Sequence, residues 1–340
     1  MKAKVIVNLP RPNADLPKDI FTNAGVDLAV VSVRDEAELI SLAKDADAFI
    51  PTITPKTSAG IIRALPKCRH IAWRGIGVES IDVDAATANG IVVTNNPHVS
   101  LEEVSDQAMA LLLALARKLF PIARAVKASG GKYDDARLRQ QIVRPLFRIK
   151  GQTFGLIGMG NIARTLVPKA QGFGLRIVAF DPFVTREIMS AHFGVEKVGL
   201  EDLLKQSDYV SLHMPLTPET ERTLKRDHLR MMKPTSYVIN TARGALIDEK
   251  ALIEALQQGW IAGAGLDVTD PEPMQMDNPM LQMDNVIITG HTGSYSETTQ
   301  KEGWHVPFEE VLLSLRGKFP TFAVNPKVKD KWLKTWSPLG

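Results

Sequence analysis

Short β-branched runs alternate with amphipathic segments along the chain, and this alternation occurs twice. The runs are apolar throughout, so both faces of each strand need cover. A parallel sheet with helices on either side provides it. In the first hundred residues we expect strands at 4–9, 28–33, 47–52, 70–75 and 91–96, separated by helices at 35–45, 58–66 and 82–90.

The same alternation begins again at Gln152. Helical stretches again separate the apolar runs, which predicts a second doubly wound sheet. A chain of 340 residues is long enough for two domains of ordinary size. The predicted fold class is therefore α/β, with two doubly wound parallel-sheet domains. The strands of the second sheet are expected at 153–158, 176–181, 208–213, 236–241, 261–268 and 285–290.

A long apolar helix and a basic segment connect the two sheets. The helix is expected from about Leu101 to Lys127, with a break near Pro121, because proline interrupts a helix interior. The glycine-bearing, basic residues 129–150 read equally well as an arm or as a plain surface loop. A last helix is expected at 296–315, followed by a tail with Trp332 and Trp336. We expect the tail to pack on the first domain; the alternative is that it covers the active-site cleft of this or a partner subunit.

Charge and composition exclude several classes of protein. Lys and Arg number 41 against 38 Asp and Glu, and the net charge of +3 is spread along the chain, so we expect no nucleic-acid partner. The longest apolar run, 108–116, is too short to cross a bilayer, and the N-terminus lacks a signal-peptide pattern. A single cysteine, Cys68, fits a reducing compartment, and it reads as a buried spacer rather than a nucleophile. We expect a cytoplasmic protein without a membrane partner or a bound metal.

A glycine motif joins the first strand and helix of the second sheet. Residues 158–163 read G-x-G-x-x-A, in which Gly158 forms the tight turn and Gly160 lets the backbone approach a pyrophosphate. Asp181 ends the next strand, close to the ~20-residue spacing expected of a ribose-binding acid. Its carboxylate repels a 2′-phosphate, which favours NAD over NADP. The alternative is that Asp181 only caps the following helix.

Three polar residues follow strands of the second sheet, where ligands bind in doubly wound folds. They are Arg243, Glu272 and His291. A carboxylate beside a histidine fixes its tautomer and favours the imidazolium, as proton exchange requires. An arginine nearby holds a carboxylate or polarises a carbonyl oxygen. Each residue alone reads as a solvated charge, but all three at one sheet edge indicate an active site.

Together these motifs resemble the D-isomer-specific 2-hydroxyacid dehydrogenase family. The resemblance covers nearly the whole chain and rests on seven segments. It implies that His291 is the general acid/base, that Glu272 orients it and that Arg243 holds a 2-oxo acid. It also implies that the N–H groups of Ile76 and Gly77 bind the substrate carboxylate. The segments are 75–95, 102–117, 151–166, 211–224, 239–252, 265–273 and 288–293.

The resemblance further implies a Rossmann NAD-binding domain at 103–295 and a flavodoxin-like substrate domain made of 1–102 and 296–340. It implies a homodimer paired largely through the cofactor domain and an arm at about 118–150. The residues expected at NAD are Gly158, Gly160, Asn161, Ile162, Asp181, His213, Pro215, Thr217, Thr241, Ala242, Arg243, Asp267, His291, Gly293 and Ser294.

Some residues depart from the family pattern and leave alternatives open. Gly290 stands where the family usually has proline, so the loop that carries His291 is freer. Ser105 and Asp106 bring the chain nearer to corepressor-like members, which leaves open an NAD-sensing scaffold with little catalysis. Phosphite oxidation and the reduction of glyoxylate or hydroxypyruvate also remain. Formate is set aside, because related formate dehydrogenases carry glutamine where Glu272 stands.

Overall fold

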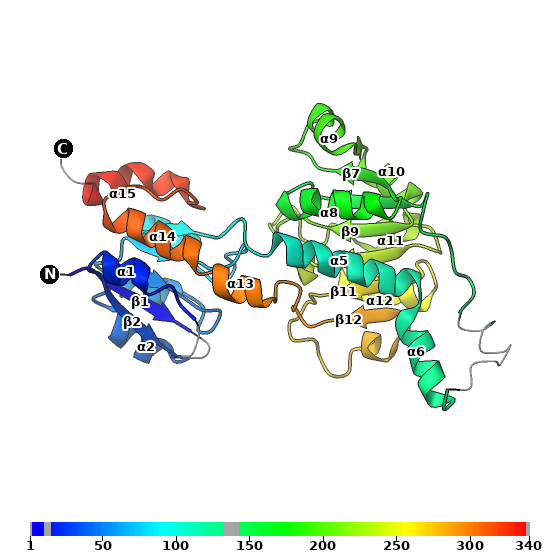
Figure 1. Ribbon diagram of the computed structural model, residues 1–340, viewed down its shortest axis with the longest axis horizontal. Helices are drawn as coiled ribbons and strands as arrows, with labels where there is room; N and C mark the ends of the chain where they lie inside the picture. The colour runs from blue at the N-terminus through cyan, green and yellow to red at the C-terminus, as the bar shows by residue number, and fades with distance from the viewer. Residues whose placement is uncertain (1, 10–14, 132–139, 141–142, 338–340) are drawn as a thin grey trace. The chain divides into compact units, whose positions relative to one another are not determined.

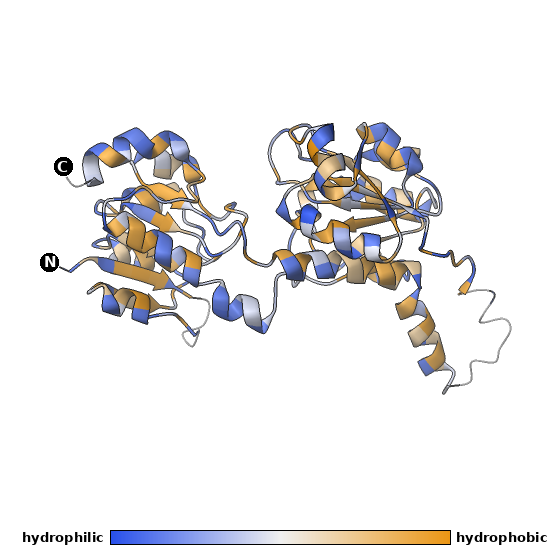
Figure 2. Ribbon diagram, turned by 45° about the horizontal axis from the view of Figure 1, so that its top comes forward, coloured by the Kyte–Doolittle hydropathy of each residue, from blue (hydrophilic) through white to orange (hydrophobic). Residues whose placement is uncertain are grey.

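The structure is a computed structural model, which describes residues 2–9, 15–131, 140 and 143–337. The chain divides into two compact units (Figure 1). Unit 1 is Met1–Ser100 with Tyr295–Gly340, and unit 2 is Leu101–Ser294. The boundaries expected from the sequence lie beside these. The strands of both sheets are largely apolar, as a sheet covered on both faces requires (Figure 2).

Unit 1 contains a parallel sheet in the order β2-β1-β3-β4-β5, which is the flavodoxin-like order. Helices α2, α3 and α4 pack on one face, and α1 and α14 pack on the other. The strands are β1 Lys4–Asn8, β2 Asp27–Val31, β3 Ala48–Ile50, β4 His70–Ala72 and β5 Val92–Thr94. The helices are α1 Asp19–Asn23, α2 Glu36–Ala43, α3 Ala59–Arg63, α4 Val83–Ala88 and α14 His305–Leu315.

Unit 2 contains a seven-stranded parallel sheet in the order β12-β11-β10-β9-β6-β7-β8. The chain reverses its direction of travel across the sheet between β6 and β9, which is the switch point of a Rossmann fold. Both predicted sheets are confirmed; only the two-residue β8 was not expected. The strands are β6 Thr153–Ile157, β7 Arg176–Phe180, β8 Glu196–Lys197, β9 Tyr209–Leu212, β10 Tyr237–Asn240, β11 Gly263–Leu266 and β12 Val286–Ile288.

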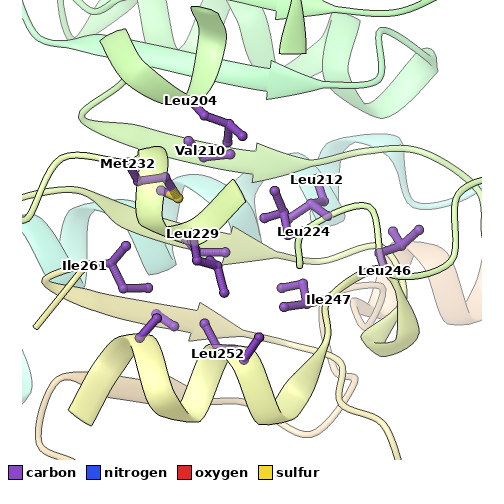
Figure 3. Close-up of a cluster of buried hydrophobic side chains, with 14 of the residues drawn as sticks. Leu204, Val210, Leu212, Leu224, Leu229, Met232, Leu246, Ile247, Leu252 and Ile261 are labelled. Atoms are coloured by element: carbon purple, nitrogen blue, oxygen red, sulfur yellow. The ribbon is translucent and has the colours of Figure 1, made fainter. Parts of the chain in front are cut away.

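Helices cover both faces of this second sheet. On one face α5, α8 and α9 bury a shared apolar cluster, and α5 and α8 run side by side (Figure 1). On the other face α10, α11 and α12 bury the cluster drawn in Figure 3. The helices are α5 Leu101–Ala116, α8 Asn161–Gly172, α9 Arg186–Phe193, α10 Leu200–Gln206, α11 Arg226–Met231 and α12 Glu249–Gln257.

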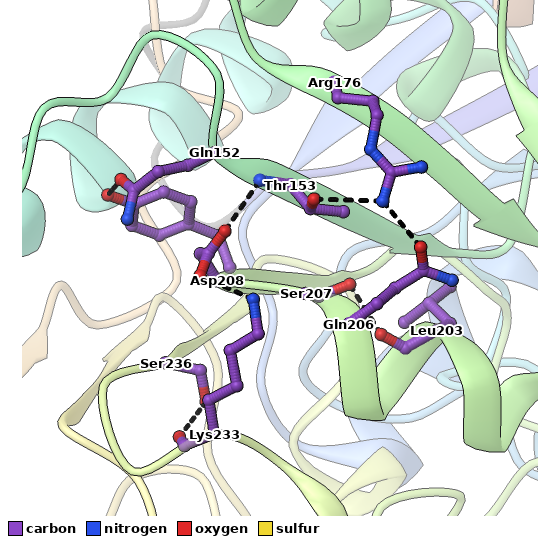
Figure 4. Close-up of polar contacts among 10 residues, drawn as sticks. Gln152, Thr153, Arg176, Leu203, Gln206, Ser207, Asp208, Lys233 and Ser236 are labelled. Carbon is purple, nitrogen blue, oxygen red and sulfur yellow. Dashed lines mark hydrogen bonds and ion pairs between the residues drawn. The ribbon is translucent and has the colours of Figure 1, made fainter.

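Polar contacts fix the amino-terminal edge of the unit 2 sheet (Figure 4). The Asp208 carboxylate accepts a hydrogen bond from the Thr153 N–H and forms an ion pair with Lys233 Nζ, both at 2.8 Å. Arg176 Nη2 donates to Thr153 Oγ1 at 3.2 Å and to Gln206 Oε1 at 2.6 Å. These bonds tie β6, β7 and β9 together at the edge opposite the predicted site.

The expected helical stretch is broken into two helices, as predicted, but the break lies at Arg117 and Lys118, a few residues before Pro121. Helix α5 ends at Ala116, and α6 spans Leu119–Ala128. Lys118 adopts a left-handed conformation (φ 50°) and turns the chain between them. Pro121 lies in the first turn of α6, where its missing N–H has no intrahelical partner to lose. Residues 132–139 and 141–142 of the expected arm lie outside the described residues.

The C-terminal segment also differs from the expectation. The helix expected at 296–315 divides at Gly303 into α13 Glu297–Glu302 and α14. The tail forms a helix, α15 Lys329–Trp336, which follows directly on a short 3-10 helix, η4 Pro326–Val328. Another 3-10 helix, η3 Pro279–Gln282, precedes β12 in unit 2. Trp332 is 0% exposed and packs with Val92 and Val328, so the tail packs on unit 1 as expected. Among the described residues, no helix has the length and apolar content to cross a membrane.

Candidate active site

The glycine motif forms a turn that only glycine tolerates. Gly158 follows β6 with φ of 97°, and a Cβ there would lie 2.8 Å from the His213 carbonyl carbon. Gly160 precedes α8 without a side-chain cap, and a Cβ on it would meet nothing closer than the His213 carbonyl oxygen at 3.9 Å. This open approach to a helix N-terminus fits a dinucleotide pyrophosphate.

The Asp181 carboxylate lies at the same turn. Its Oδ2 accepts from the Met159 N–H at 2.8 Å, and its Oδ1 accepts from the N–H groups of Phe183 and Val184 at 2.8 and 3.1 Å. The next helix, α9, is capped instead by Thr185. Asp181 is therefore not a helix cap; it connects the end of β7 to the glycine turn, where a ribose-binding acid belongs.

The segments after β9 and β10 contribute further groups to this edge of the sheet. His213 Nε2 lies 2.8 Å from Ser211 Oγ. Burial lowers the pKa of His213 to about 4, so the ring is neutral at pH 7. Pro215 and Thr217 are joined through the Thr220 hydroxyl at 2.7 and 2.8 Å. Thr241 Oγ1 is buried without a partner among the described residues, and a bound ligand could supply one.

His291 and Glu272 are in direct contact. His291 Nδ1 lies 2.6 Å from Glu272 Oε1, and the two side chains are 44% and 41% exposed. Because the carboxylate accepts a hydrogen bond from Nδ1–H, proton exchange with the substrate falls to Nε2. Gly290 and His291 both have left-handed backbones, with φ of 64° and 59°, which shape the corner after β12.

Asp267 fixes that corner. It is 2% exposed, and its Oδ1 accepts from Thr289 Oγ1 at 2.5 Å and from the Thr292 N–H at 3.0 Å. Its Oδ2 accepts from the Gly293 N–H at 2.9 Å, and its carbonyl oxygen accepts from the His291 N–H at 2.5 Å. The glycine in place of proline therefore does not leave the histidine loop without support.

Arg243 follows β10, next to β11 in the sheet. The buried Asn240 side chain accepts from the Ala242 N–H at 3.0 Å and donates to the Arg243 carbonyl at 2.8 Å, which forms the turn before η2, Gly244–Leu246. A Cβ on Gly244 would overlap the Thr269 carbonyl, so the loops after β10 and β11 touch. Arg243, Glu272 and His291 thus follow three adjacent strands, β10, β11 and β12.

The segment of unit 1 expected to bind a carboxylate follows β4. Asn95 Nδ2 donates to the Ile76 carbonyl at 2.7 Å, and the Asn96 N–H donates to the Gly75 carbonyl at 3.0 Å. The end of β5 therefore holds the loop that carries Ile76 and Gly77. Cys68 lies elsewhere, buried, and burial raises the pKa of its thiol to about 12, as suits a spacer.

Sequence reasoning missed the supporting residues of the site. Asn240 could have been found, because an asparagine at a strand end commonly binds the backbone two residues on. Thr289 and the loop-supporting contacts of Asp267 depend on side-chain direction, which the sequence pattern does not give. Ala242 follows the end of β10, whereas Ser294 lies beyond the histidine corner, at the end of unit 2.

Sequence comparisons match this chain to one family of dehydrogenases. Residues 109–293 match the family model described as D-isomer specific 2-hydroxyacid dehydrogenase, NAD binding domain. A glyoxylate reductase from Korarchaeum cryptofilum is 39% identical over 96% of this chain and 97% of its own length. A D-3-phosphoglycerate dehydrogenase from Methanocaldococcus jannaschii is 36% identical over 92% of this chain and 58% of its own length.

A solved structure extends the similarity to the fold. The NAD-complexed D-isomer specific 2-hydroxyacid dehydrogenase of Lactobacillus delbrueckii ssp. bulgaricus aligns with a TM-score of 0.78 and 26% identity. The alignment covers 95% of this chain and all of that one. The glycine turn, with its open helix N-terminus, fits the NAD of such enzymes. The chain belongs to the D-isomer-specific 2-hydroxyacid dehydrogenase family and is an NAD-dependent oxidoreductase of 2-oxo and 2-hydroxy acids.

Proposed function

We propose that the protein reduces a small 2-oxo acid with NADH, and that glyoxylate is the first substrate to test. The contact between His291 Nδ1 and Glu272 Oε1 at 2.6 Å carries the proposal, because reduction of a carbonyl needs a positioned proton donor. The choice of glyoxylate rests on the Korarchaeum relative, which is named for that substrate.

In the proposed reaction, His291 gives the proton on Nε2 to the C2 carbonyl oxygen of the substrate as that oxygen becomes an alkoxide. Bound NADH supplies the hydride that C2 receives. Glu272 stabilises the imidazolium before the transfer and holds the ring in place during it. The reverse reaction needs neutral His291 as a base, so pH sets the preferred direction.

Two further groups bind the substrate in this proposal. The Arg243 guanidinium holds the 2-oxo acid and stabilises negative charge on the C2 oxygen. The N–H groups of Ile76 and Gly77 bind the carboxylate, and the contacts from Asn95 and Asn96 keep that loop in shape. For NAD we propose the residues named from the sequence, from the glycine turn and Asp181 through Thr241 to Ser294.

A steady-state assay tests the reaction. NADH oxidation is followed with glyoxylate, hydroxypyruvate and larger 2-oxo acids, and NAD reduction is followed with phosphite. His291→Gln should lower turnover by about 10²–10⁴-fold, because a proton donor is lost. NADH binding, measured by fluorescence titration, should stay nearly unchanged. His192→Gln, at an exposed site on α9, is the matched control and should keep full turnover.

Several outcomes would contradict this proposal. Turnover of His291→Gln within a factor of a few of the wild type would remove the acid/base role. If phosphite were the one compound turned over, a 2-oxo acid would be ruled out as the substrate. Intact NADH binding without turnover on any substrate would favour the sensing scaffold.

We also propose a homodimer that pairs through α6 and the rest of the arm at about 118–150. Helix α6 buries none of its residues within the described part of the chain, and Leu119 and Phe120 are 53% and 54% exposed. A cavity of about 410 Å³ adjoins it; apolar side chains such as Phe147 and Tyr237 make up most of its lining, together with Lys118, Thr235, Asp284 and Asn285. Sedimentation should give the mass of two chains, and Phe120→Glu should shift it toward one. A wild-type monomer at micromolar concentration would refute the pairing.

The cellular location is proposed on one observation. Cys68 is a free, buried thiol, as expected of a protein kept under reducing conditions. We propose that the protein works in the cytoplasm. Fluorescence microscopy of a tagged copy in its host, or cell fractionation, would show otherwise if the protein were exported.

A further inference from the structure

A side chain from α5 reaches the histidine corner through one hydroxyl group. Gln107 Nε2 lies 2.9 Å from Thr289 Oγ1, and Thr289 Oγ1 lies 2.5 Å from Asp267 Oδ1. Asp267 in turn accepts from the Thr292 and Gly293 N–H groups and, through its carbonyl, from the His291 N–H. The three side chains form a relay that ends at the loop carrying His291.

The chemistry of the groups fixes the direction of this relay. An ionised carboxylate only accepts hydrogen bonds, so the single hydrogen of the Thr289 hydroxyl goes to Asp267. The Gln107 atom that faces Thr289 must therefore be a donor, which is its amide nitrogen. Gln107 thus holds the hydroxyl in the one orientation in which it donates to Asp267.

Packing of α5 on the sheet sets where Gln107 lies. Leu111 and Leu115 follow Gln107 at successive helical turns and face the same side. A Cβ on Gly265 would lie 3.0 Å from Leu111 Cβ and 3.1 Å from Leu115 Cδ1, so α5 lies close against β11. A Cβ on Gly293 would lie 3.2 Å from Gln107 Cγ, so the Gln107 side chain packs closely against the histidine corner.

We propose that Gln107 is a positioning residue for the proton transfer and acts on His291 through Thr289 and Asp267. This inference rests on the acid/base role proposed for His291. Without the amide donor, the Thr289 hydroxyl is free to rotate, and Asp267 loses a fixed partner. The corner then samples orientations in which Nε2 misses the substrate oxygen, and misplacement of a reacting group lowers turnover.

Two substitutions of Gln107 separate its donor from its bulk. Gln107→Met keeps the length but removes the donor, and turnover should fall about tenfold, as for a lost hydrogen bond to a charged network. Gln107→Glu keeps the shape but offers only acceptors. The single hydroxyl hydrogen of Thr289 would then face two carboxylates, so turnover should fall at least as far. The NADH dissociation constant should stay within about twofold, because Gln107 is not among the residues proposed at NAD and Asp267 keeps its hydrogen bonds from the Thr292 and Gly293 N–H groups.

A double-mutant cycle distinguishes the relay from simple packing. Thr289→Val removes the hydroxyl that connects Gln107 to Asp267 and should itself lower turnover. If Gln107 acts through that hydroxyl, Gln107→Met should add little in the Thr289→Val background. Gln171→Met is the matched control, since this glutamine on α8 donates to the Phe193 carbonyl, away from the corner, and turnover should not change.

The possible results support or overturn the relay. Non-additive losses with intact NADH binding support it. Full multiplication of the two losses, or turnover of Gln107→Met within twofold of the wild type, would overturn it. Failure of the acid/base proposal is recognised separately, because His291→Gln would then keep its turnover. Loss in His291→Gln without loss in Gln107→Met would remove the relay alone.

Discussion

At the scale of single residues, Glu272 gives the two nitrogens of His291 different tasks. Its Oε1 accepts the hydrogen bond of Nδ1 at 2.6 Å, which leaves Nε2 to exchange a proton with the substrate. Glu272→Gln removes the charge and keeps the shape. Reduction of the 2-oxo acid should slow by about 10–100-fold. The amide oxygen of glutamine makes a weaker hydrogen bond to Nδ1 than the carboxylate does, so the ring is held less firmly.

Glu297→Gln, at an exposed position at the start of α13, controls for the loss of one negative charge and should leave turnover unchanged. Both variants are assayed for the reductive reaction at saturating NADH. Turnover of Glu272→Gln within twofold of the wild type would mean that the carboxylate does not orient His291.

The sequence predicted the residues that follow strands better than those that support them. His291 and Glu272 could be paired in advance, because the ends of neighbouring parallel strands meet at one edge. Gln107 could not, because its contact with Thr289 depends on the register of α5 over β11, which close approach at Gly265 sets. Asp181 follows β7, at the strand end where the sequence put it, but its hydrogen bond from the Met159 N–H depends on side-chain direction, which the sequence does not give.

At the scale of elements, strands were easier to predict than the ends of helices. Apolar runs locate buried strands directly, since each needs cover on both faces. The break between α5 and α6 depends on a left-handed lysine, Lys118, and no local pattern marks it, because most residues other than glycine avoid that conformation. Helix α15 was missed because its fixed position comes from tertiary contacts of Trp332 rather than from periodicity.

Helix α15 should contribute to stability rather than catalysis. Trp332 is fully buried, and its Nε1 donates to the Arg69 carbonyl at 2.8 Å. Trp332→Ala should therefore lower the free energy of unfolding of unit 1 by about 3–5 kcal/mol, through lost packing and a cavity. Urea unfolding measures the change. Michaelis constants measured well below the unfolding midpoint should match the wild type.

Lys334→Ala, on the exposed side of the same helix, is the control and should change the free energy of unfolding by less than about 0.5 kcal/mol. A large change in the Michaelis constants of Trp332→Ala, with little loss of stability, would instead place this helix at the active site.

At the scale of the whole molecule, each unit holds a histidine that resists protonation; His70 is fully buried and His213 is half-buried. In unit 1, His70 is fully buried between Thr94 Oγ1 at 2.8 Å and Ser314 Oγ at 3.1 Å. Burial lowers its pKa to about 3, because the cation would lose its hydration. In unit 2, burial lowers the pKa of His213 to about 4. Both rings are therefore neutral in the folded protein at physiological pH.

These lowered pKa values make the fold sensitive to mild acid. Below the ordinary histidine pKa of about 6.5, the unfolded chain takes up a proton that the folded chain refuses, so stability falls as pH falls. For His70 the loss between pH 7 and pH 5 should be about 2 kcal/mol, and it should continue down to its folded pKa of about 3. Ordinary exposed carboxylates titrate mainly below this range, so the pH 7 to 5 window isolates histidines.

Tryptophan fluorescence during urea unfolding can follow unit 1, which contains Trp73, Trp304, Trp332 and Trp336, while Trp260 lies in unit 2. The midpoint should fall from pH 7 to pH 5. His70→Gln replaces the ring with a side chain that does not titrate, so its midpoint should start lower but change less with pH. An equal pH dependence in the variant would show that His70 takes up its proton while folded and does not set the acid sensitivity of unit 1.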